Sequence, residues 1–151
     1  MTELHVETER LVAAPADLVY QCIADYRVHH PRFLPPAFSG FRVEEGGVGA
    51  GTVHSFQLTA GRRTRSYRMR VDEPEPGRVL TESDERSSLV TTFTVTPDGA
   101  GCRVRIGTRW QGAGGVGGFF ERLFAPRVLT GLYADELERL DRYVRSLPAT
   151  E

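Results

Sequence analysis

Hydrophobic and polar residues alternate with a period of two through the middle of the chain, a pattern typical of half-buried β-strands. Glycine, proline and aspartate separate the alternating runs, and the connections are short, so neighbouring strands are expected to pair antiparallel. The predicted strands are Leu4–Ala13, Phe41–Glu45, Thr52–Thr59, Arg63–Asp72, Val79–Asp84, Leu89–Thr96 and Cys102–Trp110.

Two stretches have helical spacing instead. Ala14-Pro15-Ala16-Asp17 predicts the start of a short helix that ends near Tyr26, and the proline-rich residues 27–38 have room for at most one more. A long amphipathic helix ends the chain, and Pro126 is expected to kink it or to mark a restart. The apolar stripe of this helix consists of Phe120, Leu123, Phe124, Leu129, Leu132, Tyr133, Leu137, Leu140 and Val144.

A sheet with one apolar face needs a cover, and the terminal helix is the largest apolar surface available. We therefore predict an α+β fold in a single domain, residues 1–151. It combines a curved antiparallel sheet of about seven strands, the long C-terminal helix, and one or two short helices after the first strand.

Turn lengths predict which side chains share the inner face of the sheet, because a shift of one residue reverses them all. Thr81 is expected to face Thr91, His54 to face Tyr67, and Glu82 to lie on the outer face. Polar inner residues indicate a partly polar cavity, or else a network in which these groups satisfy one another and a few waters. The residues predicted to line the cavity are His54, Phe56, Arg65, Tyr67, Met69, Thr81, Ser83, Leu89, Thr91, Phe93, Thr108, Trp110, Phe120, Phe124 and Leu129.

Three of these residues could carry chemistry. His54 is a candidate general base, Tyr67 an orienting hydroxyl, and Arg65 a partner for a carboxylate or enolate oxygen, with Glu85 as its counter-charge. A structural network of the same three side chains is the alternative, and it is the favoured one.

Other motifs do not predict a site. Adjacent histidines, His29 and His30, are interpreted as solvated loop residues, so no metal site is predicted. The glycine-rich run from Gly112 to Gly117 matches a dinucleotide fingerprint, but no second parallel strand follows it, so it is interpreted as a flexible loop at the cavity rim.

Composition narrows the classes of function. The chain has 151 residues, a net charge of −1 and 19 basic residues, all of them arginine, which excludes a P-loop, a lysine Schiff base and a pyridoxal phosphate site. No cofactor, nucleic-acid partner or integral membrane association is expected. Cys22 and Cys102 lie in apolar patterns, so we expect no disulfide and a cytoplasmic location. The protein is expected to be a monomer or homodimer.

Several segments together resemble one known family. The opening LVAAPADLVYQCIADY, the prolines of HHPRFLPPAF, the turns GGVGAGT and VDEPEPGRVL, and the closing FFERLFAPRVLTGLYADELERLDRYV are similar to the polyketide cyclase/dehydrase-like branch of the START superfamily. That superfamily, also called SRPBCC, includes the birch-pollen-allergen-like proteins. The resemblance implies a helix-grip fold, in which the sheet wraps the terminal helix and encloses a cavity for lipids, polyketides or other apolar molecules.

Three functions follow as hypotheses. The first is the binding of a small hydrophobic or aromatic molecule between the sheet and the C-terminal helix. The second is a polyketide aromatase/cyclase or dehydratase that uses acid–base residues of the cavity and no cofactor. The third is a protein-interaction module without a ligand, which predicts a large exposed apolar patch.

Overall fold

The computed structural model describes residues 3–111 and 126–148 of the chain. Seven strands form one antiparallel sheet with the spatial order β1-β7-β6-β5-β4-β3-β2. The strands are β1 (Glu3–Val12), β2 (Phe38–Glu45), β3 (Val53–Ala60), β4 (Arg63–Glu75), β5 (Val79–Asp84), β6 (Val90–Asp98) and β7 (Gly101–Gln111).

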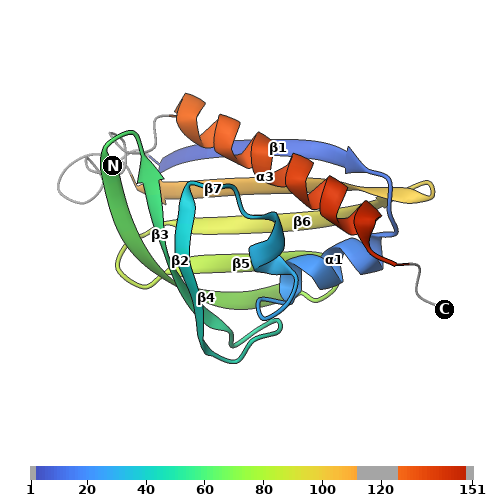
Figure 1. Cartoon of the computed structure of the whole chain (residues 1–151), viewed down its shortest axis with the longest axis horizontal. Coiled ribbons are helices and arrows are strands. Elements are labelled where there is room, and N and C mark those ends of the chain that lie inside the picture. The colour runs from blue at the N-terminus through green and yellow to red at the C-terminus, as the bar shows by residue number, and fades with distance from the viewer. Residues whose placement is uncertain (1–2, 112–125, 149–151) are drawn as a thin grey trace.

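Three helical segments accompany the sheet. Helix α1 (Ala16–Ala24) and the 3-10 helix η1 (His30–Phe33) follow β1, and the long helix α3 (Pro126–Ser146) ends the described part of the chain. Figure 1 shows α3 running across one face of the sheet, with β2 and β3 at the left, steeply inclined to the other strands. The predicted α+β helix-grip architecture is confirmed. Pro126 is the first described residue of α3, and the predicted residues before it lie outside the described part of the chain.

Helix α3 is held on the sheet by an apolar stripe and by an ion pair between the buried Asp141 carboxylate and a half-exposed arginine of β1. Asp141, 5% exposed, lies 3.0 Å from Nε of Arg10 on β1 and 2.9 Å from Nε of Arg145 one turn along the helix. The stripe has the three- and four-residue spacing of one helix face. Its buried members are Leu129, Tyr133, Leu137, Leu140 and Val144.

The glycine-rich connection between β2 and β3, residues 46–51, is fastened by Glu73 on β4. The Glu73 carboxylate accepts hydrogen bonds from the backbone N–H of Ala50 at 2.8 Å and from the hydroxyl of Tyr20 at 2.7 Å. Gly49 has a φ of +68°, and a Cβ there would lie 2.3 Å from Oε1 of Glu73. Glycine at this position therefore permits both the turn and the carboxylate contact.

The predicted register of β5 is wrong by one residue. Leu80 pairs with Phe93 and Glu82 with Thr91, so Leu80, Glu82 and Asp84 are buried on the inner face. The sequence pattern had favoured small hydroxyl residues inside and carboxylates in water. The inward carboxylates of Glu82 and Asp84 are tolerated because hydrogen-bond donors and an arginine inside the protein pair with them. The predicted inward positions Thr81 and Ser83 pair instead with Thr92 and Val90, away from the pocket.

The neighbouring hairpin differs by two residues, which keeps the face and changes the partners. His54 pairs with Met69 and Phe56 with Tyr67, so His54 does not face Tyr67 directly. On β6 and β7 the predicted pairs Thr91–Thr108 and Phe93–Ile106 are confirmed.

In the described part of the chain, no helix is both long and apolar enough to cross a membrane. Among the described residues, the large exposed apolar side chains are few and come from four separate segments. They are Leu11, Val28, Val48 and Val128. They give the interaction-module hypothesis no positive support.

Candidate functional site

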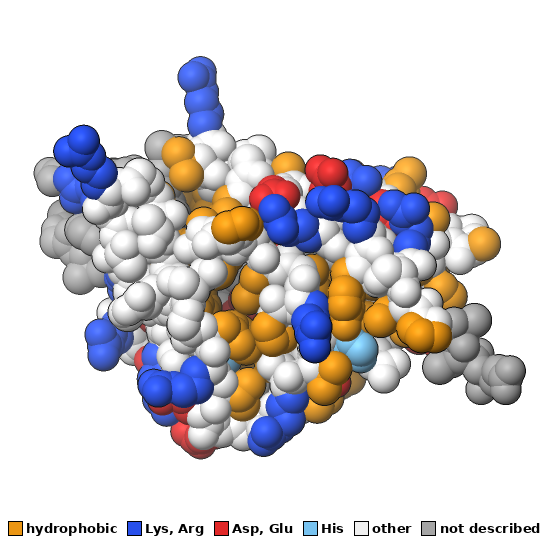
Figure 2. Space-filling model, in the orientation of Figure 1, with side chains coloured by type: hydrophobic (Ala, Val, Ile, Leu, Met, Phe, Trp, Pro, Cys, Tyr) orange, Lys and Arg blue, Asp and Glu red, His pale blue; other side chains and the backbone are white. Residues whose placement is uncertain are grey.

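A pocket opens between the inner face of the sheet and α3. It contains about 630 Å³ of space that no atom fills, part of it open to solvent. In Figure 2, hydrophobic side chains gather around a hollow in the middle of this face, below α3. The lining residues are His30, Leu34, Phe38, Phe41, His54, Phe56, Leu58, Tyr67, Met69, Glu82, Leu89, Thr91, Phe93, Ile106, Thr108, Trp110, Leu129, Tyr133 and Glu136.

Aromatic rings stack along one wall of this pocket. Tyr26, which follows α1, stacks on both imidazoles, with ring centroids 4.3 Å from His30 and 4.5 Å from His54, while the two imidazoles lie 6.3 Å apart. The stack continues to Phe56 at 5.8 Å from His54, and then to Tyr67 at 5.3 Å from Phe56. These distances fit favourable offset stacking, so the wall is rigid and presents flat apolar surface to a ligand.

Glu82 projects from β5 into this stack and is 7% exposed. Its Oε2 accepts a short hydrogen bond from the Tyr26 hydroxyl and lies 3.3 Å from Nε2 of His54 and 3.9 Å from Nε2 of His30. Burial raises the pKa of this carboxyl, but His54, His30 and Tyr26 together outweigh burial and hold the pKa below its ordinary value. Glu82 is therefore a buried carboxylate anion at neutral pH.

His30 is a neutral acceptor next to this anion. Its Nδ1 lies 2.7 Å from the backbone carbonyl of Ile23, which can only accept, so Nδ1 carries the hydrogen. Burial lowers the pKa of His30 to about 4, which leaves Nε2 without a hydrogen at neutral pH. A ligand hydroxyl or N–H placed between Nε2 of His30 and Oε2 of Glu82 would therefore meet two acceptors.

His54 offers the complementary arrangement. Its Nε2 faces the Glu82 carboxylate, so the hydrogen is favoured on that nitrogen. Both ring nitrogens are buried without a well-aligned hydrogen bond in the described part of the chain, with Nε2 at 3.3 Å from the carboxylate and Nδ1 beside no acidic group. His54 and Glu82 thus form a pair in which a base is oriented by a carboxylate.

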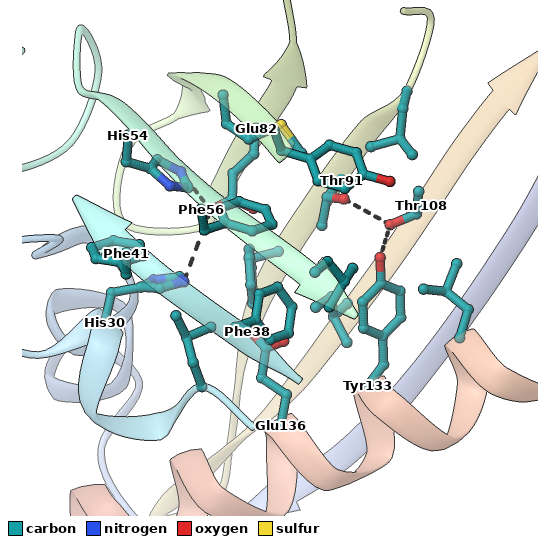
Figure 3. A pocket seen from close by; sticks show the side chains of 18 of the residues that line it. His30, Phe38, Phe41, His54, Phe56, Glu82, Thr91, Thr108, Tyr133 and Glu136 are labelled. Atoms are coloured by element: carbon teal, nitrogen blue, oxygen red, sulfur yellow. Dashed lines mark hydrogen bonds and ion pairs between the residues drawn. The ribbon is translucent and has the colours of Figure 1, made fainter. Parts of the chain in front are cut away.

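Glu136 projects into the pocket from α3, on the opposite side from β5 (Figure 3). It is 2% exposed, and no residue that the structure describes donates a hydrogen bond to it. Burial, and then the nearby charges of Glu82 and Asp135, raise the pKa of Glu136 well above its ordinary value. Glu136 is a neutral carboxylic acid where Glu82 is an anion, and carboxyls separated in this way can act as proton donor and acceptor.

Three hydroxyls form a chain along the floor of the pocket. Thr91 Oγ1 and Thr108 Oγ1 lie 2.7 Å apart, and Thr108 makes a short hydrogen bond with the hydroxyl of Tyr133 from α3 (Figure 3). Burial raises the pKa of Tyr133, so the phenol stays protonated. The chain joins the sheet to α3 across the pocket and supplies neutral polar groups to a ligand.

Arg65 lies behind the aromatic stack and does not line the pocket. Its guanidinium stands 4.6 Å above the Tyr67 ring, and Nη2 lies 3.2 Å from Oδ2 of Asp84, which is buried. The predicted counter-charge Glu85 is wrong, because Glu85 pairs with Arg68 and the inward side chain at the end of β5 is Asp84. Arg65 thus compensates a buried carboxylate instead of facing a ligand.

The structure brings most of the predicted cavity residues together. Thr81, Ser83 and Arg65 are not among the lining residues, for the reasons of register and pairing given above, and Phe120 and Phe124 lie outside the described residues. The predicted residues that line the pocket are His54, Phe56, Tyr67, Met69, Leu89, Thr91, Phe93, Thr108, Trp110 and Leu129.

Sequence reasoning missed the charged part of the site. Glu136 carried a usable signal, because it falls three residues after Tyr133 and seven after Leu129, on the apolar stripe itself. The interpretation of His30 as a solvated residue is wrong, since it is 2% exposed. No group of metal-ligating side chains with the geometry of an ion site occurs among the described residues.

Comparisons with known proteins agree with this architecture. A family model described as polyketide cyclase/dehydrase and lipid transport matches residues 3–145. The solution structure of the KanY protein is 39% identical over 97% of this chain and 100% of that chain, with a TM-score of 0.86. No curated protein matches significantly.

More distant structures share the fold alone. Norcoclaurine synthase from Thalictrum flavum, solved in complex with dopamine and hydroxybenzaldehyde, is 20% identical over 99% of this chain and 90% of that chain, with a TM-score of 0.75. Major latex-like protein 151 from Panax ginseng is 13% identical over 97% of this chain and 99% of that chain, with a TM-score of 0.73.

Proposed function

Because the chain belongs to the polyketide cyclase/dehydrase and lipid transport family, matched over residues 3–145, we propose that it binds a small, largely apolar molecule such as a lipid or a polyketide. The observation that carries the proposal is the pocket, in which stacked aromatic rings and aliphatic side chains surround a few placed polar groups. Cys22 and Cys102 are free and buried, which supports action in the reducing cytoplasm. A monomer or homodimer remains part of the proposal.

The test measures the binding of a neutral ligand by the fluorescence of a tryptophan that lines the pocket. Trp110 is the single tryptophan of the chain and lines the pocket at 2% exposure. We expect 4-phenylbutan-1-ol to change Trp110 fluorescence saturably. At about 0.5 kcal/mol for each of its roughly 11 heavy atoms, the dissociation constant would be about 0.1 mM.

Two variants of α3 provide the control. Leu129→Phe fills space in the pocket and is expected to weaken binding about tenfold or more, whereas Val128→Phe lies on the exposed face of the same helix and leaves binding unchanged. Thermal unfolding checks that both variants fold. The proposal fails if no neutral phenylalkyl or naphthyl compound binds, or if both substitutions have equal effects.

A second candidate function is acid–base catalysis on a polyketide, favoured by the opposed ionisation of Glu82 and Glu136. In a dehydration, His54 oriented by Glu82 removes a proton from the carbon next to a carbonyl. Glu136 gives its proton to the β-hydroxyl, which leaves as water, and solvent exchange resets both groups. Of the three residues predicted from sequence, His54 fits this role; Tyr67 belongs to the stack and Arg65 to the Asp84 pair.

A panel of β-hydroxy ketides, followed by ultraviolet absorbance of the conjugated product, tests this candidate. We expect Glu136→Gln to lower turnover about 10²- to 10⁴-fold while substrate binding persists, and Glu138→Gln, on the exposed face of α3, to turn over like the wild type. Absence of turnover by the wild type across the panel would remove the enzyme hypothesis and leave ligand binding in place.

A further inference from the structure

The described lining of the pocket contains acidic side chains and no basic side chain other than histidine. Glu82 and Glu136 are its carboxyls, and no arginine belongs to the lining among the described residues. Arg65, the nearest cation on the inner face, is held by Asp84 behind the aromatic stack. His30 adds no charge at neutral pH, because burial lowers its pKa to about 4. The electrostatic potential in the pocket therefore favours positive charge.

Glu136 is the group in this lining that lacks compensation. Glu82 is surrounded by the hydroxyl of Tyr26 and two imidazoles, whereas Glu136 is 2% exposed and receives no hydrogen bond from the described residues. Asp135, its neighbour on α3, and Glu82 across the pocket both oppose a negative charge there. Burial of a carboxyl under these conditions is costly unless a further group pairs with it.

We propose that the pocket prefers a ligand with a protonated amine, whose cationic nitrogen pairs with Glu136 while its apolar part contacts the aromatic wall. This inference rests on the proposed ligand binding and names the chemical class of the ligand. The rings of Phe38 and Tyr133 lie nearest to Glu136 in Figure 3, and ring faces attract a cation as well.

The proton balance of this step is explicit. The ligand enters as an ammonium ion, the carboxylic acid of Glu136 releases its proton to solvent, and an ammonium–carboxylate pair forms. One proton is therefore released for each amine bound whenever the pH lies below the pKa of free Glu136. In that range the affinity for the amine rises with pH, up to about tenfold per pH unit.

A carboxylate ligand lacks this gain. It would have to approach the anion of Glu82 without a cation in the described lining to receive it. A neutral alcohol can accept a hydrogen bond from the acid of Glu136, so it binds but gains no ion pair. The expected order of affinity is amine, then alcohol, then carboxylate.

The experiment is isothermal titration calorimetry at pH 7 with three matched compounds: 4-phenylbutylamine, 4-phenylbutan-1-ol and 5-phenylpentanoate. We expect the amine to bind at least about tenfold more tightly than the alcohol, and the carboxylate at least about tenfold more weakly. Titrations of the wild type in buffers of small and large ionisation enthalpy are expected to report release of about one proton with the amine and none with the alcohol.

Variants locate the charge. Glu136→Gln keeps the shape and is expected to reduce amine affinity to that of the alcohol and to abolish proton release, without changing alcohol affinity. Glu138 lies two residues further along α3, and its side chain is half exposed, so Glu138→Gln is expected to match the wild type in every titration. Should Glu136→Gln fail to fold, the buffer dependence of the wild type still decides the question.

The outcomes separate this inference from the proposal beneath it. Equal affinities for amine and alcohol, no proton release, or an amine preference that persists in Glu136→Gln would each overturn the amine assignment and leave ligand binding standing. Failure of all three compounds and of larger neutral ligands would instead refute ligand binding itself.

Discussion

The raised pKa of Glu136 makes a quantitative prediction about the stability of the unliganded protein. In the unfolded chain this carboxyl ionises near its ordinary pKa of 4.5, whereas in the folded protein burial and Glu82 keep it protonated well above that value. The unfolded state therefore loses a proton that the folded state retains. The contribution of Glu136 to folding is fully present below pH 4.5 and is lost as the pH rises toward the folded-state pKa.

The magnitude follows from the linkage of one proton. Between the two pKa values of Glu136, the free energy of unfolding of the wild type falls by about 1.4 kcal/mol per pH unit relative to a chain with an uncharged side chain there. Glu136→Gln removes this dependence, so the variant gains about 2.7 kcal/mol on the wild type over the first two pH units. The gain levels off at the folded-state pKa, so the assay also measures that pKa.

Urea denaturation followed by circular dichroism, from pH 5 to pH 8, is the measurement. Glu138→Gln on the exposed face of the same helix is the control and is expected to parallel the wild type. Each kcal/mol corresponds to about 2–4 °C in Tm for a chain of this length. Parallel stability curves for Glu136→Gln and the wild type would refute the neutral, uncompensated carboxyl at position 136. They would also remove the basis of the proposed dehydration and of the proposed amine binding.

Three further predictions concern single residues. Because the pKa of His30 is lowered to about 4, its ring is expected to titrate by NMR near pH 4 and to withdraw stability as the pH falls below 6.5; a midpoint near 6.5 would contradict its burial. Leu80→Ala is expected to cost about 2–5 kcal/mol in urea denaturation and Thr81→Ala less than about 0.5 kcal/mol, whereas the opposite order would restore the register expected from sequence. Glu73→Ala is expected to cost about 1–3 kcal/mol and to speed amide exchange in residues 46–51; unchanged exchange would separate Glu73 from that loop.

The strands and their order could be predicted because the alternating pattern is long and the connecting turns are short. The register of β5 could not, because Val79 and Leu80 are nearly equivalent as inward residues. Polarity alone placed Glu82 in water, and only the tertiary contacts of Glu82 with Tyr26 and His54 reverse that preference. A pairing between residues distant in sequence is invisible to a local pattern.

The apolar wall of the pocket could be predicted from the sequence, whereas most of its charged part could not. Phe56, Met69 and Phe93 follow from strand alternation, whereas His30 is brought in by a 3-10 helix whose position depends on packing against α3. Glu136 could have been predicted from the sequence, because a carboxyl in the middle of a buried helical stripe is rare without a partner or a function.

The position of Glu136 also marks the point on α3 where packing against the sheet ends and the pocket begins. A leucine at position 136 would continue the stripe of Tyr133, Leu137 and Leu140 and would carry no burial cost. The chain instead places an acid there, at the point where α3 meets the pocket rather than the sheet. Glu82 obtains hydrogen-bond partners from the protein itself, whereas the described residues supply none to Glu136, and this difference is the reason for proposing a ligand amine as the partner of Glu136. The loss of folding stability that Glu136 causes and the gain in amine affinity that it is expected to provide both depend on the ionisation of this carboxyl. Both are therefore expected to disappear in Glu136→Gln.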